Sequence, residues 1–407
     1  MNQDANNIGD SALRSPALIA LLVTAFFVAL GFGLVVPIIP TFARELDATL
    51  DQAAAVVSVF ALVRLASSAP AGWVSDRVGS RKLIIAGLLI VAASSAAVIT
   101  ADSYWDLLVL RGIGGVGSAA FVVGMGQYLI LTIPNRERGR AQGLLQGSFL
   151  MGGASGPAVG GLLVDAFGLT APFLIYAITL GIAAVIAMAY IVDVRGERSS
   201  PEADRALLGQ VFANRTFWIA MFMALTLNWA TQGIRSFAVS VYGIEDLDMT
   251  AGQVGWYLTV AALVHAVVLI PGSQAIDRLG RRPMARAGLL IYVVAVAMMA
   301  ISASQGQLLI ALIIQGVAIG VVSSVPAAVI ADVSPGPVAG RIVGFSTVAR
   351  DIGVVVGVQA MGSISQRSSF ANAFWITAAL LALAFVASLF MRETLAAEAA
   401  GSSSVPA

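Results

Sequence analysis

The chain has 407 residues, of which 58% are hydrophobic and 11% charged, and its mean hydropathy is +0.90. Soluble domains carry about 25% charged residues, so this composition predicts a protein whose surface faces lipid. The absence of cysteine excludes disulfides, thiolate metal sites and thiol catalysis, and a single histidine gives no basis for a histidine-built metal site. The net charge of +1 gives no reason to expect a nucleic-acid partner.

Twelve apolar segments are long enough to cross a hydrocarbon core of about 30 Å. They lie near 17–43, 51–75, 83–101, 105–131, 142–165, 171–192, 216–241, 251–275, 284–303, 307–331, 342–364 and 371–391. The polar N-terminal tail, 1–16, lacks the basic start of a signal peptide, so we expect the first span to be retained. Segment 194–214 is predicted to be a solvated linker between bundles at 17–193 and 215–391, and 392–407 a disordered tail.

The basic residues are distributed unevenly between the two sides of these spans. Seventeen of the 23 Lys and Arg residues fall in the N-terminus, the even-numbered loops and the C-terminus, against two in the odd-numbered loops. By the positive-inside rule, both termini are expected on the cytoplasmic side of the cell membrane. The remaining four lie within spans: Arg64, Arg111, Arg235 and Arg350.

An ungapped offset of 201 residues aligns the two halves of the chain. It pairs, for example, Asp76-Arg77 with Asp277-Arg278 and Gly139-Arg140 with Gly340-Arg341. The possible capping boxes at Thr49-x-x-Gln52 and Thr250-x-x-Gln253 are also matched, and they predict the starts of spans 2 and 8. The chain is therefore predicted to be an all-α membrane protein of two six-helix bundles in the same orientation, related by a pseudo-twofold axis along the membrane normal.

The fifth span contains the sequence GGASGPAVGG at 152–161 between apolar flanks. Gly152, Gly156 and Gly160 recur every four residues, which lets a second helix approach closely on that face. Pro157 is expected to bend the helix, and Gly161 completes the motif. The stretch therefore predicts a closely packed, bent helix in a membrane protein that moves.

Four other motifs accompany this stretch: GWVSDRVGSRK at 72–82, its weaker copy SQAIDRLGRR at 273–282, RGIGGVG at 111–117 and VPIIP at 36–40. Together with 152–161 they resemble the major facilitator superfamily, and within it the twelve-span drug:proton antiporter group. The resemblance covers 15–395. It implies the two-bundle fold, a small-molecule substrate, and a proton gradient as energy source in a monomer without cofactor or metal.

The resemblance also implies a conformational latch in the loops after spans 2 and 8. Asp76 is implied to meet the positive N-terminal end of span 11, with arginines adding charge pairs when the protein faces outward. The latch candidates are Gly72, Asp76, Arg77, Gly79, Arg81, Asp277, Arg278, Gly280 and Arg282. The alternative is that these residues only satisfy the positive-inside rule, but the recurrence of the aspartate and of a tight glycine turn favours the latch.

Ionisable residues inside spans are functional candidates by default. Asp351 is the only acid found deep in a span, and it lies about 15 Å deep, close to the depth of Arg64 at about 18 Å. Asp351 is therefore predicted to be either a proton carrier or the permanent ion-pair partner of Arg64. Arg111 stays charged, and the resemblance gives it a proton-coupling or structural role. His265, the repeat partner of Arg64, is a second proton candidate or a packing residue.

Span 7 carries a polar stripe of Asn228, Gln232 and Arg235, which share one helix face, with Trp229 beside it. In the fold that the chain resembles, spans 1, 4, 7 and 10 line a central cavity. The substrate-cavity candidates are Asn228, Trp229, Gln232, Arg235, Phe26, Phe121, Gln127 and Gln315. Hydrogen bonding between helices is the alternative explanation of the stripe. With four intramembrane arginines and one aspartate, neutral, zwitterionic or anionic substrates are favoured.

These features predict a proton-coupled exporter of small amphipathic molecules that works by alternating access. A facilitator or symporter for one metabolite is the main alternative. An intramembrane serine protease, with Ser155 as nucleophile and His265 as base, and a non-transporting sensor are more remote, because neither explains twelve spans in two repeats or the complete glycine motif.

Overall fold

The computed structural model describes residues 15–133, 138–193, 204–334 and 339–395, and in these ranges it contains helices and no β-strand. The chain divides into two compact units. Unit 1 comprises Met1–Arg198 with Thr250–Thr259, and unit 2 comprises Ser199–Met249 with Val260–Ala407. The units divide between Arg198 and Ser199, and the start of the eighth predicted span groups with unit 1. The predicted bundle bounds, 17–193 and 215–391, stay a prediction.

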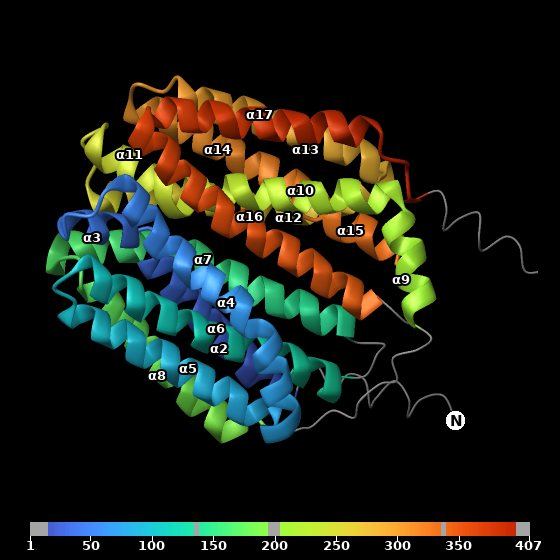
Figure 1. Ribbon diagram of the computed structural model, residues 1–407, viewed down its shortest axis with the longest axis horizontal. Helices are drawn as coiled ribbons and strands as arrows, with labels where there is room; N and C mark the ends of the chain where they lie inside the picture. Colours follow the sequence, from blue (N-terminus) through green and yellow to red (C-terminus); the bar gives the residue numbers. More distant parts are fainter. Residues whose placement is uncertain (1–14, 134–137, 194–203, 335–338, 396–407) are drawn as a thin grey trace, which may run out of the picture. The chain divides into compact units, whose positions relative to one another are not determined.

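Unit 1 is built from helices that occupy the first six predicted spans (Figure 1). They are α2 (Pro16–Val35), α3 (Ile39–Glu45), α4 (Leu50–Val78), α5 (Ser80–Ala97) with η1 (Val98–Thr100), α6 (Tyr104–Thr132), α7 (Arg138–Phe167) and α8 (Ala171–Tyr190). The most extensive packing is of α2 on α7 and α8, of α5 on α6 and α8, and of α4 on α6.

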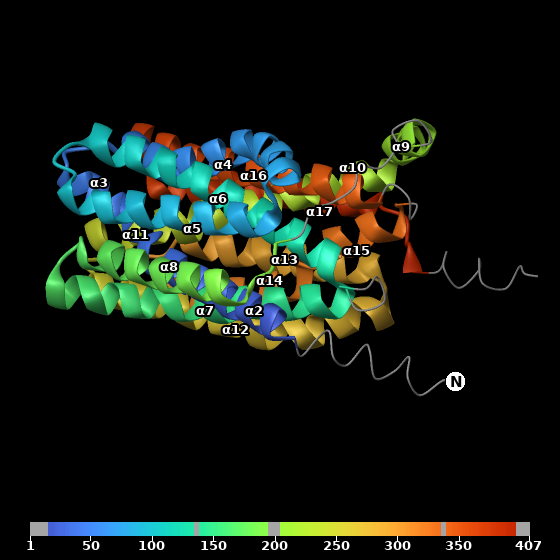
Figure 2. The same cartoon turned by 90° about the horizontal axis from the view of Figure 1, so that it is seen from below.

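Unit 2 repeats this order with a few differences. Its helices are α9 (Asp204–Ala213), α10 (Arg215–Gly233), η2 (Ile234–Ala238), α11 (Val239–Glu245), most of α12 (Ala251–Leu279), α13 (Arg281–Ala300), α14 (Gln305–Val322), α15 (Val325–Asp332), α16 (Ala339–Arg367) and α17 (Phe370–Leu389). Relative to unit 1, α9, η2 and α15 are additional elements, and η1 has no counterpart among the described residues. The packing of α10 on α16, and of α13 on α14 and α17, matches the pairs of unit 1 at the repeat offset; Figure 2 shows α13 beside α14. Helix α9 lies inside the segment predicted to be a linker.

Ten helices of the described chain are long and apolar enough to cross a membrane. The two remaining predicted spans, 216–241 and 342–364, are also helical in the structure, as α10 to α11 and as α16. Both contain the polar residues that the sequence marks as functional candidates, among them Asn228 and Arg235 in the first and Asp351 in the second. These helices therefore combine membrane-spanning length with polar side chains that lower their mean hydropathy.

Local sequence explains where the second and third helices of each unit begin. Thr49 and Gln52 form the predicted capping box at the start of α4, and Thr250 and Gln253 form the same pair before α12. Between the second and third helices, Gly79 and Gly280 have φ angles of 93° and 102°. Only glycine adopts this conformation without strain, so both tight turns depend on it.

Candidate functional site

The glycine face of α7 packs directly on the backbone of α2. A Cβ atom added to Gly156 would lie 2.6 Å from backbone atoms of Gly33 and Leu30, and Gly152 and Gly160 are in similar contact with Phe26 and Leu34. Side chains at these positions would force the helices apart, so the four-residue glycine spacing produces the close approach expected of it.

Other residues of the motif, Ala158 and Gly161, contact the first turns of α12. These turns belong to unit 1. Gly161 lies against the backbone of Ala251, and the backbone N–H of Ala158 donates to Thr259 Oγ1 at 3.0 Å. Near the end of α7, Asp165 accepts hydrogen bonds from the backbone N–H of Gly252 and from Thr250 Oγ1. A carboxylate at the positive end of a helix is favourable, so this contact fixes the start of α12.

Unit 2 contains a reduced version of the same packing. Gly353 and Gly357 of α16, the repeat partners of Gly152 and Gly156, lie against the backbone of α10 at Leu225 and Trp229. The close helix pair is therefore common to both units.

The turn after α4 holds three of the unit 1 latch candidates. Asp76 accepts a hydrogen bond from Gln127 Nε2 at 2.9 Å, and Arg77 stacks over the ring of Trp73 at 3.5 Å. Arg81 reaches across to α8 and donates to the carbonyl of Met188 at 2.6 Å. Within its own unit, Arg81 therefore connects the third helix to the sixth. The predicted latching of one half to the other stays a prediction.

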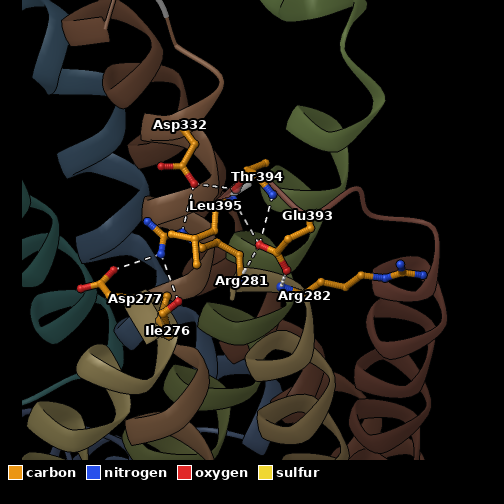
Figure 3. A network of polar contacts seen from close by, with 8 residues as sticks. All are labelled: Ile276, Asp277, Arg281, Arg282, Asp332, Glu393, Thr394 and Leu395. Atoms are coloured by element: carbon orange, nitrogen blue, oxygen red, sulfur yellow. Dashed lines mark hydrogen bonds and ion pairs between the residues drawn. The ribbon is translucent and has the colours of Figure 1, made fainter. Parts of the chain in front are cut away.

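The corresponding turn of unit 2 carries a larger charged network (Figure 3). The guanidinium of Arg281 donates to Asp277 at 3.0 Å and to Asp332 at 3.1 Å. Thr394 Oγ1 donates to the same Asp332 carboxylate. Arg282 repeats the role of Arg81 by donating to the carbonyl of Leu389 at 2.8 Å, while Arg278 is exposed.

Glu393, after α17, caps the start of α13 in this network. Its carboxylate accepts from the backbone N–H groups of Arg281 and Arg282 at 2.9 and 3.0 Å, and also from those of Thr394 and Leu395. Partial burial raises the pKa of Glu393, but these four hydrogen bonds outweigh it and leave the pKa below its usual value. The carboxylate is thus held in the charged form at neutral pH.

The ionisable residues inside the spans lie in different surroundings. Arg111 is buried in α6, with its guanidinium 4.5 Å from the centre of the Phe60 ring. Arg64 lies in α4 of unit 1 and Asp351 in α16 of unit 2, so their pairing stays a prediction.

A second group of polar residues lies inside unit 2, between α10, α12, α13 and α14. The hydroxyl of Tyr292 is 3.0 Å from Thr231 Oγ1 and accepts from Gln315 Nε2 at 3.2 Å. Arg235, one turn after Thr231, donates to the carbonyl of Ala261 on α12 at 3.2 Å. Arg235 and Gln315 of the predicted cavity set therefore lie within one unit, where Arg235 contacts α12 and Gln315 contacts α13.

The other cavity candidates are less uniform. Asn228 bonds to the carbonyl of Ala224 in its own helix, and Trp229 Nε1 donates to Thr377 of α17. Phe121 is buried where α6 packs on Gly87 of α5. Gln127 hydrogen bonds to Asp76, and the ring of Phe26 packs edge-on against that of Phe27. Asn228, Trp229, Phe121 and Gln127 thus make helix packing or hydrogen-bond contacts within their units, and Gln232 is half-buried.

Comparison with known proteins settles the family. Residues 21–250 and 227–406 match the Major Facilitator Superfamily. The chain belongs to this superfamily. It is 26% identical to the multidrug resistance protein MdtG of Dickeya zeae, over 90% of this chain and 92% of that protein. It is 23% identical to an uncharacterised MFS-type transporter of Methanocaldococcus jannaschii, over 88% and 93% of the two chains. A tetracycline resistance protein of class C from Escherichia coli is 32% identical over 41% of this chain and 42% of that protein.

Solved structures of transporters have the same fold. A bacterial homologue of the human lysosomal transporter Spinster superposes with a TM-score of 0.79 at 16% identity, covering 92% of this chain and 97% of that one. A POT family transporter bound to 5-aminolevulinic acid gives 0.76 at 14% identity, over 92% and 95%. Membership of a transporter superfamily also makes the protease hypothesis unnecessary; Ser155 Oγ donates to the carbonyl of Met151 in its own helix.

Sequence reasoning missed several residues of this superfamily member that the structure connects. Glu393 and Asp332 lie 112 and 51 residues from Arg281, so no local spacing relates them to it. A usable signal was the position of Asp332, Glu393 and Asp193, each near the end of a predicted span. Tyr292 was missed because a tyrosine in an apolar span has no distinguishing pattern.

Proposed function

We propose that this protein is a proton-coupled exporter of small amphipathic molecules, working by alternating access in the cytoplasmic membrane with both termini inside. Its relatives named as multidrug and tetracycline resistance proteins support export, and the distribution of basic residues supports the orientation. Binding energy for the proton and for the substrate would favour different states of one equilibrium.

The main structural support for this proposal is the packing of α7 on two other helices. Its glycine face lies on the backbone of α2, and its outer end contacts the start of α12 through Ala158, Gly161 and Asp165. Small residues at such interfaces let two helix backbones pack closely without interlocking side chains. A helix with such contacts to the first and eighth spans suits a transporter whose parts move relative to one another.

The test begins with drug-sensitive cells, which are grown with and without the protein against a panel of inhibitory compounds to find a substrate. Uptake of that substrate into inverted vesicles is then measured with and without a proton gradient. Asp351→Asn is expected to abolish gradient-driven uptake and to spare substrate exchange, because the neutral side chain no longer binds and releases a proton. Asp248→Asn, an exposed acid between spans, is the matched control. If the wild type takes up substrate equally fast with and without a proton gradient, the protein is instead a facilitator.

A further inference from the structure

The polar group inside unit 2 contains buried atoms that the fold leaves without a partner. We define the Arg235 cluster as Thr231, Arg235, His265, Tyr292 and Gln315. In the described part of the chain, three of its atoms have no hydrogen-bond partner: Arg235 Nε, His265 Nε2 and Gln315 Oε1. Gln315 has no exposed surface at all. Buried polar atoms are almost always paired, so three orphans in one cluster require an explanation.

The cluster is connected by hydrogen bonds and by helix geometry. Tyr292 joins Thr231 of α10 to Gln315 of α14, and Thr231 and Arg235 are one turn apart. Arg235 donates to Ala261, and His265 follows Ala261 by one turn on α12. The donors of Arg235 and His265 and the amide of Gln315 therefore lie around one region of unit 2.

The backbone conformation near Arg235 is a second indication of a ligand site in this region. Arg235 lies in η2, a five-residue π-helical turn that interrupts an otherwise continuous α-helix from 215 to 245. Such a turn inserts a residue into the helix, weakens its hydrogen bonding and is frequent at functional sites. Because the turn changes the direction of the side chains that follow Gly233, it sets where the Arg235 guanidinium points.

The charge of the cluster defines the ligand. Arg235 remains cationic, and no ion pair to it is present among the described residues. In unit 1, the buried guanidinium of Arg111 lies over the Phe60 ring, which supplies a favourable partner for its charge. For Arg235 the described contacts offer only a carbonyl, which leaves most of the positive charge uncompensated in a medium of low dielectric.

We propose that the Arg235 cluster binds the carboxylate of an amphipathic organic acid, with donors from Arg235 and His265 and with Gln315 accepting from a neighbouring hydroxyl or N–H of the ligand. This inference rests on the proposed export function, because it names the class of substrate. A planar guanidinium matches the two oxygens of a carboxylate. The orphan acceptor of Gln315 favours acids that carry a donor near the carboxylate.

Binding to the purified protein tests the proposal independently of transport. The probes are 1-pyrenebutyrate, 1-pyrenebutyramide and 1-pyrenebutylamine, together with the matching naphthalene series, followed by fluorescence titration. The wild type is expected to bind the carboxylates about tenfold more tightly than the amides, because hydrogen bonds to charged groups are the stronger ones. Arg235→Gln should remove this preference, and His265→Gln should reduce it several-fold, while amide binding is unchanged.

Two further variants keep the test decisive. Arg235→Lys retains charge without the planar fork and should keep part of the preference, whereas Arg286→Gln, in the second turn of α13, should keep all of it. Retained amide binding shows that a variant is folded. Equal affinity of the wild type for carboxylate and amide in both series, or a preference that survives Arg235→Gln, overturns the inference. A carboxylate preference without proton-driven efflux would sustain the site and refute the exporter.

Discussion

The two units share one turn between their second and third helices but surround it with different charges. In both units a glycine has a left-handed φ angle, and an arginine two residues later donates to a carbonyl of the sixth helix. These acceptors, Met188 and Leu389, are themselves 201 residues apart. Where unit 2 has Arg281 and Asp332, however, unit 1 has Ser80 and Leu131. The recurrence of the backbone contacts indicates that the turn itself needs only these, and that the ion pairs are specific to unit 2.

The largest effect is expected when only one residue of the Arg281–Asp332 ion pair is replaced by its unit 1 counterpart. Arg281→Ser leaves the carboxylate of Asp332 largely buried without its cation, which should cost about 3 kcal/mol of the free energy of unfolding. The double variant Arg281→Ser/Asp332→Leu reproduces the unit 1 pair and should recover most of that loss. Denaturation in detergent measures both. A double variant no more stable than the single one would show that the charges are required for folding of this turn.

The helix pairs that the units share can be tested next. Gly156→Ala and Gly357→Ala each place a Cβ about 2.6 Å from backbone atoms of the facing helix, which should cost about 1–3 kcal/mol in either unit. Gly153→Ala is the control because its Cβ meets nothing within 4 Å. Thermal unfolding in detergent checks the set. An equal loss at Gly153 would mean that helix packing is not the cause.

The Glu393 cap on α13 makes the stability of unit 2 depend on pH. Glu393→Gln should lower the free energy of unfolding by about 1 kcal/mol at pH 7, as for other lost helix caps. Because the pKa of Glu393 is lowered on folding, its contribution is complete above the unfolded pKa of about 4.3 and is lost as pH falls through the folded value. Unfolding measured between pH 7 and 3 should therefore show a smaller decline in the variant. Arg392→Gln, the exposed neighbour, should keep the wild-type decline.

The smallest effect is expected before the second helices. Asp47 and Asp248 occupy repeat positions and have φ angles of 59° and 51°. Replacing either with glycine relieves the left-handed strain but loses backbone entropy, so the stability should change by less than about 0.5 kcal/mol. The same sign is expected in both units by thermal unfolding. A loss above about 1 kcal/mol in one unit alone would reveal a side-chain role that the repeat does not share.

The fold was predictable because its signals are long or repeated. Apolar runs set the spans, one offset related the halves, and the tight turns at Gly79 and Gly280 followed from glycine in both copies. The capping boxes at Thr49 and Thr250 were predictable because their contacts span only three residues. Where a signal is local or periodic, the sequence is sufficient.

The candidate site was harder to predict from the sequence because its contacts are neither local nor periodic. Regular helix spacing placed Asn228, Gln232 and Arg235 on one face, but the π-helical turn from Ile234 changes that register, and no residue pattern marked it. Gln127 hydrogen bonds to Asp76, 51 residues away, and no local spacing relates these two residues. Side-chain direction on a span depends on neighbouring helices that periodicity alone does not identify.

A carboxylate follows the last helix of each unit in the sequence, and it lies at a turn that is synthesised much earlier. Asp193 lies against Gly79, and Glu393 caps the start of α13 at a separation of 112 residues from Arg281. A ribosome makes each of these acids only after the sixth helix of its unit, so each turn lacks its neighbouring carboxylate until then. Unit 1 can be completed while unit 2 is still being translated, in keeping with the N-terminal-first folding of multidomain chains. A stop codon before residue 393 would remove the Glu393 cap of the second turn and leave Asp193 beside the first.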